Sequence, residues 1–165
     1  MKSEMEKYAT LSLVSTVLTG IFTSIHHSYE IAYKAIVLAL FVVVLPVLTM
    51  QWLKRTGSRV ALWVYGLLTA WLVLAFGMID GLWNHTINGL GSYVNNAVLS
   101  IHGSMPSGGE EVVANALAGN LIYQAAGVLT FIASTFAAYY GIKFLRTRKQ
   151  LVPASIQNVA KDQNV

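Results

Sequence analysis

The chain contains no cysteine and few charged residues. Without cysteine there can be no disulfide framework, no thiolate metal site and no thiol catalysis. Charged residues make up 11% of the 165 residues, whereas a soluble domain usually carries about 25%. Because so few charges cannot cover a water-exposed surface, the composition indicates an integral membrane protein. The net charge of +4 follows from the membrane-flanking pattern described below and does not indicate a nucleic-acid partner.

Four long apolar runs occupy most of the chain. Each provides the roughly 20 helical residues that cross a bilayer, and none alternates as a strand does, so helices are the predicted form. We therefore expect an all-α four-helix transmembrane bundle as a single domain over residues 1–149, followed by a disordered polar tail at 150–165. The first run lacks a signal-peptidase cleavage pattern and is predicted to stay as a span. The four expected spans are 8–27, 31–53, 60–83 and 118–145.

The basic residues predict the orientation of these spans. All Lys and Arg residues except Lys34 fall before span one, between spans two and three, or from the end of span four onwards. Loops rich in Lys and Arg stay in the cytoplasm. We therefore expect both termini in the cytoplasm and the protein in a bacterial inner (plasma) membrane.

Two further features concern span four and the connection that leads to it. Apolar residues at helical spacing in the outer connection, residues 86–117, predict a short helix lying on the outer membrane surface. On span four, Ala133, Ala137 and Gly141 recur every fourth residue, which suits close helix contact. Packing within the chain is the favoured interpretation; contact with a membrane partner or a second copy is the alternative.

The polar residues that stand out lie at the outer ends of spans one and three. His26, His27 and Glu30 follow the first run, and Asp80 and His85 close the third. At 1.5 Å per residue, both groups lie roughly 30 Å from the basic residues that begin their spans. They are therefore expected at one depth. Because ionisable groups within a membrane are costly, such a cluster indicates a functional site.

Histidine with carboxylate is a ligand set that suits Zn, Cu, Fe or Ni. His26 and Glu30 are four residues apart, so a helix would place them side by side. Ser28 and Asn84 are candidates to orient a ligating ring from outside the ligand set. On an ideal α-helix, however, residues five positions apart such as Asp80 and His85 point about 140° away from each other. One of the two should then point elsewhere, unless the helix ends there.

A structural interpretation of the same residues is also open. Glu30 can be a first-turn acid of span two, with Ser28 as the N-cap. The paired histidines can be ordinary interfacial residues, and Asp80 can lock two helices together through one of them. His102, in the outer connection, is expected to be solvated.

The two segments HHSYE at 26–30 and DGLWNH at 80–85 carry a resemblance. They resemble the ends of spans one and three in a group of small bacterial four-helix inner-membrane proteins, which have a His-His-x-Tyr-Glu end and an acid-Gly-x-aromatic-Asn-His end. The resemblance covers about the first 90 residues. The group's second segment has Glu-Gly-Gly-Tyr where this chain has DGLW. The resemblance implies a shared site that includes Glu30, Asp80 and His85, but no substrate.

Three hypotheses for function follow from the sequence. The first is a membrane protein with a His/carboxylate metal site at the outer, periplasmic face, used in metal handling or in serving a redox partner. The second is a non-catalytic structural or accessory subunit of a membrane complex, in which the polar cluster only joins helix ends. The third is a haem-binding electron carrier with paired histidines as axial ligands. The pattern leaves open whether the protein is an enzyme.

Overall fold

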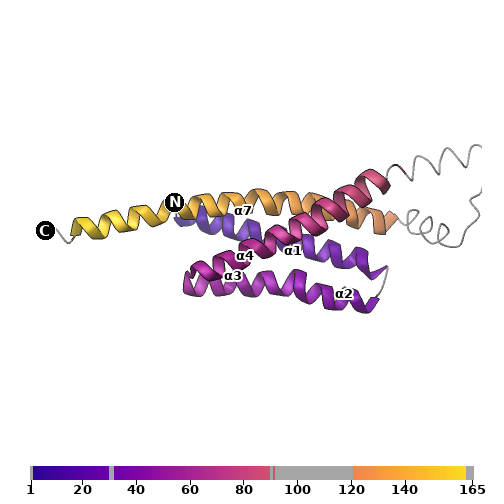
Figure 1. The fold of residues 1–165 in the computed structure, drawn as a ribbon, viewed down its shortest axis with the longest axis horizontal. Helices are drawn as coiled ribbons and strands as arrows, with labels where there is room; N and C mark the ends of the chain where they lie inside the picture. Colours follow the sequence, from indigo (N-terminus) through magenta and orange to yellow (C-terminus); the bar gives the residue numbers. More distant parts are fainter. Residues whose placement is uncertain (1, 30–31, 90, 92–120, 163–165) are drawn as a thin grey trace, which may run out of the picture.

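The computed structural model describes residues 2–29, 32–89, 91 and 121–162, and this part of the chain is helical and contains no strand. Long helices lie side by side, and the N-terminus and the C-terminal half of the last helix lie at the same end of the bundle (Figure 1). The expected all-helical fold is confirmed. The helical segments are α1 (Lys2–Ser28), α2 (Ala32–Ala39), η1 (Leu40–Val44), α3 (Leu45–Thr56), α4 (Arg59–Leu72), η2 (Val73–Asn88) and α7 (Leu121–Asp162).

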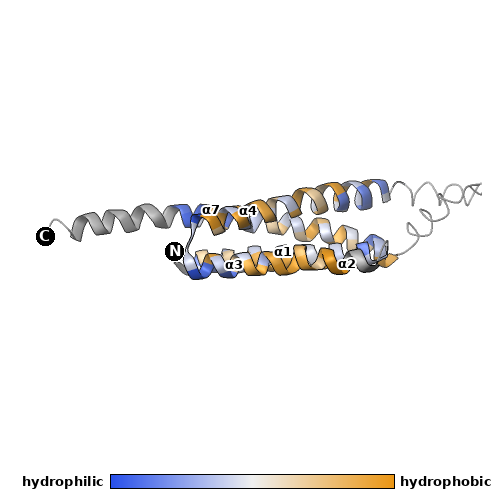
Figure 2. Ribbon diagram, turned by 60° about the horizontal axis from the view of Figure 1, so that its bottom comes forward, coloured by the Kyte–Doolittle hydropathy of each residue, from blue (hydrophilic) through white to orange (hydrophobic). Residues whose placement is uncertain are grey.

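Among the described residues, four helices are long and apolar enough to cross a membrane, as expected. Hydrophobic residues colour the middle of each helix, and hydrophilic residues gather towards the helix ends (Figure 2). The third helix continues about five residues beyond the expected end of its span. The four membrane-length helices are Ser3–Ser28, Ile36–Thr56, Arg59–Asn88 and Leu121–Lys149.

Two expectations concern segments at the edge of the described chain. Helix α7 continues to Asp162 and so includes most of the tail at 150–165, for which we expected disorder. The tail contains no glycine to form a helix C-cap. The predicted surface helix in the outer connection falls mostly within residues 92–120, which are outside the described residues. Glu30 and His102 are also outside the described residues.

Helices α1 and α7 pack against each other along much of their length. Their contact is made by small and hydroxyl-bearing side chains, which allow two helix backbones to approach closely. The hydroxyl groups of Thr16 and Thr130 donate to carbonyls of their own helices, so these two buried hydroxyls are satisfied within the apolar interior. Ala133 and Ala137 are buried within the bundle, where the small-residue stripe of α7 packs. The buried hydroxyl residues of these two helices are Ser12, Ser15, Thr16, Thr19, Thr23, Thr130 and Ser134.

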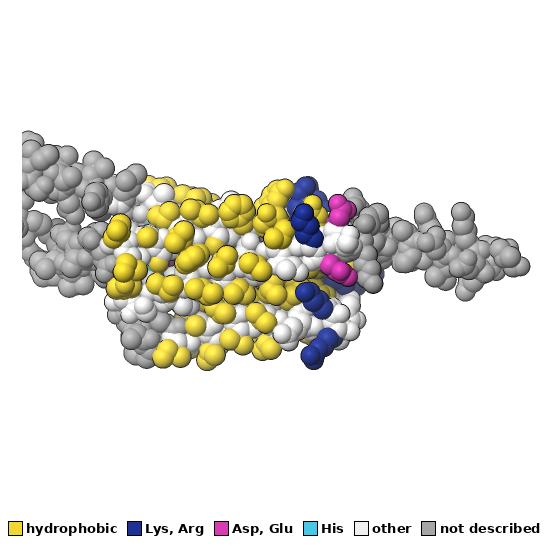
Figure 3. Space-filling view, turned by 180° about the vertical axis from the view of Figure 1, so that it is seen from behind, with side chains coloured by type: hydrophobic (Ala, Val, Ile, Leu, Met, Phe, Trp, Pro, Cys, Tyr) yellow, Lys and Arg dark blue, Asp and Glu magenta, His cyan; other side chains and the backbone are white. Residues whose placement is uncertain are grey.

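One end of the bundle has an apolar core surrounded by cations. We call it the basic end, defined by Lys54, Arg55, Arg59, Arg146 and Arg148. Lys and Arg side chains form a band there at the limit of the hydrophobic surface (Figure 3). The chain reverses between α3 and α4 at a left-handed glycine and a serine N-cap, a combination that ends one helix and starts the next. The buried core of this end consists of Ala9, Met50, Leu53, Ala61, Tyr65 and Phe144.

The second helix contains a short π-helical segment, η1, just before Pro46. Proline cannot donate to the carbonyl four residues earlier, and its ring crowds that carbonyl. Here that carbonyl belongs to Val42, and Gly20 of α1 lies against it. A side chain at position 20 would meet the Val42 carbonyl, so glycine allows α1 and η1 to touch.

Candidate metal centre

At the end of the bundle opposite the basic end, three histidines surround one carboxylate. We call His26, His27, Asp80 and His85 the histidine cluster. His26 Nε2 is 3.1 Å from Asp80 Oδ2, and His27 Nε2 is 3.6 Å from the same oxygen. His85 Nε2 is 3.8 Å from Asp80 Oδ1. The last turn of α1 therefore meets η2, and the two groups lie at one level of the bundle, as the sequence predicts.

The π-helical geometry of η2 explains why Asp80 and His85 face the same way. A π-helix closes its hydrogen bonds between residues five apart, so such residues share one face of the helix. The amide of Gly89 donates to the Asn84 carbonyl, and the Thr86 hydroxyl donates to the Gly81 carbonyl at 2.9 Å. Both bonds span five residues. The 140° separation expected for an α-helix is removed by this wider turn, and the helix does not end there.

Asp80 also has a partner on its own helix. The Asn84 side-chain amide donates to Asp80 Oδ1 at 3.2 Å. This bond leaves the second carboxylate oxygen directed at His26 and His27. Asn84 thus holds the carboxylate from outside the ring of histidines, whereas the sequence makes it a candidate to orient a ligating ring.

Helix α7 supplies the third wall of the cluster. Tyr123 stacks on the His26 ring, with ring centroids 4.9 Å apart, and meets the His85 ring edge-on at 4.8 Å. Gln124 Oε1 lies 3.1 Å from His85 Nδ1. If Nδ1 carries the proton that this oxygen accepts, the Nε2 lone pair points towards Asp80 and is available to a metal.

Glycines on two helices make room for this arrangement. A Cβ at Gly127 of α7 would collide with the His85 ring, and one at Gly89 would meet Gln124 Oε1 at 2.7 Å. Gly81 of η2 lies against the α7 backbone, where a Cβ would be 2.9 Å from the Gly127 carbonyl oxygen. The cluster therefore depends on close backbone contact between η2 and α7.

Burial makes the negative charge of the Asp80 carboxylate energetically costly. The side chains of His26 and His85 are 1% and 4% exposed, and that of Asp80 is 16% exposed. A carboxylate removed from water is strongly destabilised unless a cation or several hydrogen bonds compensate it. His27, at 24% exposed, is the most accessible member. A protonated imidazole or a bound metal ion would supply the compensating charge.

The cluster has the ligand atoms that a metal ion requires. One atom each from His26, Asp80 and His85 lies within 4.8 Å of the others. Bonds from Zn to nitrogen or oxygen are about 2.0–2.2 Å, which places donors on one ion roughly 3–3.5 Å apart. A contraction of the widest separation by about 1.5 Å, within reach of side-chain rotation, would therefore close the three donors on an ion.

One predicted site residue, Ser28, makes a different contact, and three residues beside the cluster were not predicted. The Ser28 hydroxyl donates to the Ile25 carbonyl of its own helix at 2.6 Å. Glu30 is outside the described residues. Tyr123, Gln124 and Gly127 were missed, because an aromatic, an amide and a glycine in an apolar run are common in ordinary helix packing.

No protein-family model matches this chain, and neither a curated protein nor a solved structure matches it.

Proposed function

We propose that this chain is an integral membrane protein that binds a transition-metal ion in the histidine cluster. In this proposal both termini lie in the cytoplasm and the cluster faces the periplasm. The site serves metal handling or a redox partner. The convergence of His26 from α1 with Asp80 and His85 from η2 is the observation that carries the proposal.

The number of imidazoles favours a metal ion over a purely structural contact. To lock two helices together, one histidine paired with Asp80 would be enough. The cluster instead places three imidazoles within 3.8 Å of that carboxylate, and His26 and His85 are buried. The additional imidazoles supply more ligand atoms than a contact between two helices needs, and a metal ion can use all of them.

The ring positions favour a metal ion over haem. Two axial imidazoles lie on opposite faces of a haem, with the macrocycle between them. The rings of His26 and His85 are in direct edge-to-face contact, with centroids 4.4 Å apart. They leave no space for a macrocycle, whereas a single ion can sit at their edges.

The donor set narrows the metal and the chemistry. Two imidazoles and one carboxylate leave coordination positions open, as in catalytic zinc sites and in non-haem iron sites. His27 can fill one of these positions. The absence of thiolates disfavours a site for Cu(I), so Zn²⁺, Fe²⁺, Ni²⁺ and Cu²⁺ are the candidate ions.

Elemental analysis of detergent-purified protein, without added metal, tests the proposal. We expect close to one metal ion per chain in the natural protein and a loss of most of it in Asp80→Asn and His26→Ala. Trp83→Phe is the matched control, because Trp83 lies on the same helix and is 58% exposed. Its metal content should equal that of the natural protein.

The result that overturns the proposal is also specific. If the natural protein carries no metal and gains no thermal stability from added Zn²⁺, Fe²⁺, Ni²⁺ or Cu²⁺, the cluster does not bind a metal. If Asp80→Asn then unfolds at a lower temperature, the structural role of the cluster remains.

The absence of cysteine allows a separate test of orientation. Ser3 is exposed near the N-terminus, and Ile87 is 48% exposed beside the histidine cluster. In intact cells a membrane-impermeant maleimide should label Ile87→Cys and should not label Ser3→Cys. The reverse pattern would place the cluster on the cytoplasmic face.

A further inference from the structure

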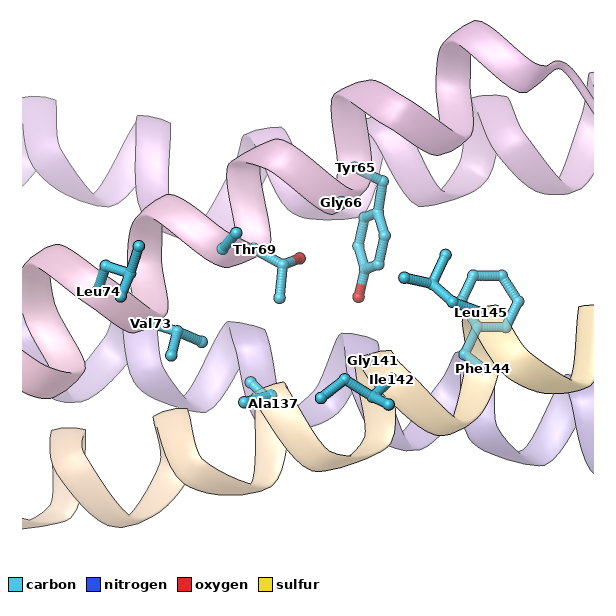
Figure 4. Close-up of a pocket in the computed structure, with 12 residues that line it drawn as sticks. Tyr65, Gly66, Thr69, Val73, Leu74, Ala137, Gly141, Ile142, Phe144 and Leu145 are labelled. Carbon is cyan, nitrogen blue, oxygen red and sulfur yellow. The ribbon is translucent and has the colours of Figure 1, made fainter.

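A lateral groove separates α4 and the start of η2 from α7. It has a volume of about 320 Å³. Its lining is almost wholly apolar, and its side chains come from the two facing helices (Figure 4). Leu74 and Ile142 line it and are 61% and 51% exposed, so the groove opens sideways, onto the lateral surface of the bundle. The lateral groove is defined by Gly66, Val73, Leu74, Ala137, Gly141 and Ile142.

A second cavity lies between the same two helices at the basic end. It has a volume of about 460 Å³, and Arg59, Arg148 and Lys149 line it together with Trp63. We call it the basic pocket. Arg148 Nη2 donates to the Gly57 carbonyl at 2.6 Å, which fixes the guanidinium beside the start of α4. Neither this pocket nor the lateral groove is lined by an acidic residue.

The two cavities adjoin each other. Leu145 lines both of them, so the basic pocket lies directly beyond the wall of the apolar groove. The groove follows the third helix from Tyr65 to Leu74, a rise of about 14 Å at 1.5 Å per residue. That rise is about half of a hydrocarbon core that is roughly 30 Å thick. The groove therefore has about the length of one lipid leaflet, and the cations of the basic pocket lie at the end of the groove nearest the basic end.

We propose that the basic pocket and the lateral groove together bind one anionic glycerophospholipid. The phosphate lies among Arg59, Arg148 and Lys149, and one acyl chain lies in the groove. This proposal rests on the membrane insertion proposed above, but not on the metal site. Basic pockets between membrane helices on the cytoplasmic side are known sites for anionic headgroups, and arginine binds phosphate through paired hydrogen bonds.

A defined site differs from general attraction between basic loops and anionic lipid. General attraction depends on charge alone, so every cationic side chain at the basic end would contribute about equally to lipid binding. Arg146 is on α7, two residues before Arg148, yet lines none of the cavities described at this end. A third cavity at the basic end is lined by Glu6, and the carboxylate of Glu6 would repel a lipid phosphate there. A lipid bound in the basic pocket would therefore depend on Arg148 and not on Arg146.

Gly66 offers a direct way to test the acyl chain. A Cβ added there would meet no atom within 4 Å, although Gly66 lines the groove. A larger side chain at this position would thus extend from open space into the groove that we assign to the acyl chain. Leu67 is the matched position outside the groove, because it is the next residue and is 65% exposed.

Native mass spectrometry of the full chain in detergent tests the proposal, with phosphatidylglycerol and phosphatidylcholine of identical acyl chains as probes. We expect a one-to-one adduct with phosphatidylglycerol and at least about fivefold weaker binding of phosphatidylcholine. Arg148→Gln should weaken phosphatidylglycerol binding by about fivefold or more, and Arg146→Gln should leave it unchanged. Gly66→Leu should weaken the binding of both lipids, and Leu67→Phe should not.

Equal losses in Arg146→Gln and Arg148→Gln would show diffuse attraction and overturn the proposal. Full binding by Gly66→Leu would exclude an acyl chain in the groove. Competition by free glycerol phosphate as effective as that of phosphatidylglycerol would show an anion site without a lipid tail. Metal content should stay unchanged in Arg148→Gln and Gly66→Leu, so failure of the lipid site and failure of the metal site are separable.

Discussion

The two ends of the bundle are built on different principles. At the basic end, α-helices pack through an apolar core that includes Met50, Leu53 and Phe144. At the histidine end, polar rings pack around a carboxylate, and glycines let a π-helix touch α7. Side-chain volume thus stabilises the basic end, whereas backbone proximity and polar contacts hold the histidine end. The two ends should therefore respond to opposite kinds of substitution.

The π-helix is the structural reason for this difference. π-Helices are rare in proteins; most are single turns, and many of these lie at functional sites. The π-helix η2 is much longer than one turn, since it covers 16 residues. Its wider turn aligns Asp80 with His85 and leaves Asn84 able to hold the carboxylate. The same helix is an ordinary α-helix where it packs at the basic end. The departure from α-helical geometry thus coincides with the polar cluster.

The strongest way to break the comparison is a matched pair of glycine substitutions. Gly127→Ala places a Cβ against the His85 ring, and such overpacking costs about 1–3 kcal/mol of stability. It should also displace His85 and release the metal. Gly66→Ala adds a Cβ in open space and should stabilise the helix by up to about 1 kcal/mol. Thermal unfolding in detergent, combined with elemental analysis, measures both effects. Similar behaviour of the two variants would contradict the contrast between the ends.

Gln124 sharpens the comparison at the histidine end. Its Oε1 lies 3.1 Å from His85 Nδ1, and residues that orient a ligating histidine typically contribute 10–100-fold to metal affinity. Gln124→Leu should weaken metal binding by about that factor, measured by competition with a chelator of known affinity. Gln124→Glu keeps an acceptor and should retain binding. Thr135→Val, which removes an exposed hydroxyl on the same helix, is the control. Equal losses in the Leu and Glu variants would show that Gln124 acts through packing alone.

The sequence predicts much of the frame and only part of the site. Apolar runs predict four membrane-length helices because a bilayer permits few other spanning forms. Counting 1.5 Å per residue places His27 and Asp80 at one depth, and the structure brings their side-chain atoms within 3.6 Å. The lateral contacts could not be predicted in this way. Which helix faces which depends on close packing at residues such as Gly127, and hydropathy does not record it.

The π-helix is the clearest case of a feature that sequence reasoning missed. Asp80 and His85 are five residues apart, so an α-helical reading places them about 140° apart. No residue type marks a π-helix in the way that proline marks a kink. The wide turn coincides with contacts that form only in the folded bundle, including the contact of Gly81 with α7.

The smallest expected effect is at the basic end, where a buried side-chain hydrogen bond between α1 and α4 should matter little. Tyr65 is 2% exposed, and its hydroxyl lies 2.9 Å from Ser12 Oγ. Tyr65→Phe keeps the ring in the apolar core and removes one hydrogen bond, so we expect a loss of about 1 kcal/mol in unfolding free energy. Metal content should not change, since the substitution is far along the bundle from Asp80. Ser12→Ala should cost a similar amount, and the double variant should cost less than the sum, because the two single changes remove the same bond. Additive losses, or a loss of metal from Tyr65→Phe, would mean that the two ends are coupled through the hydroxyl groups of α1.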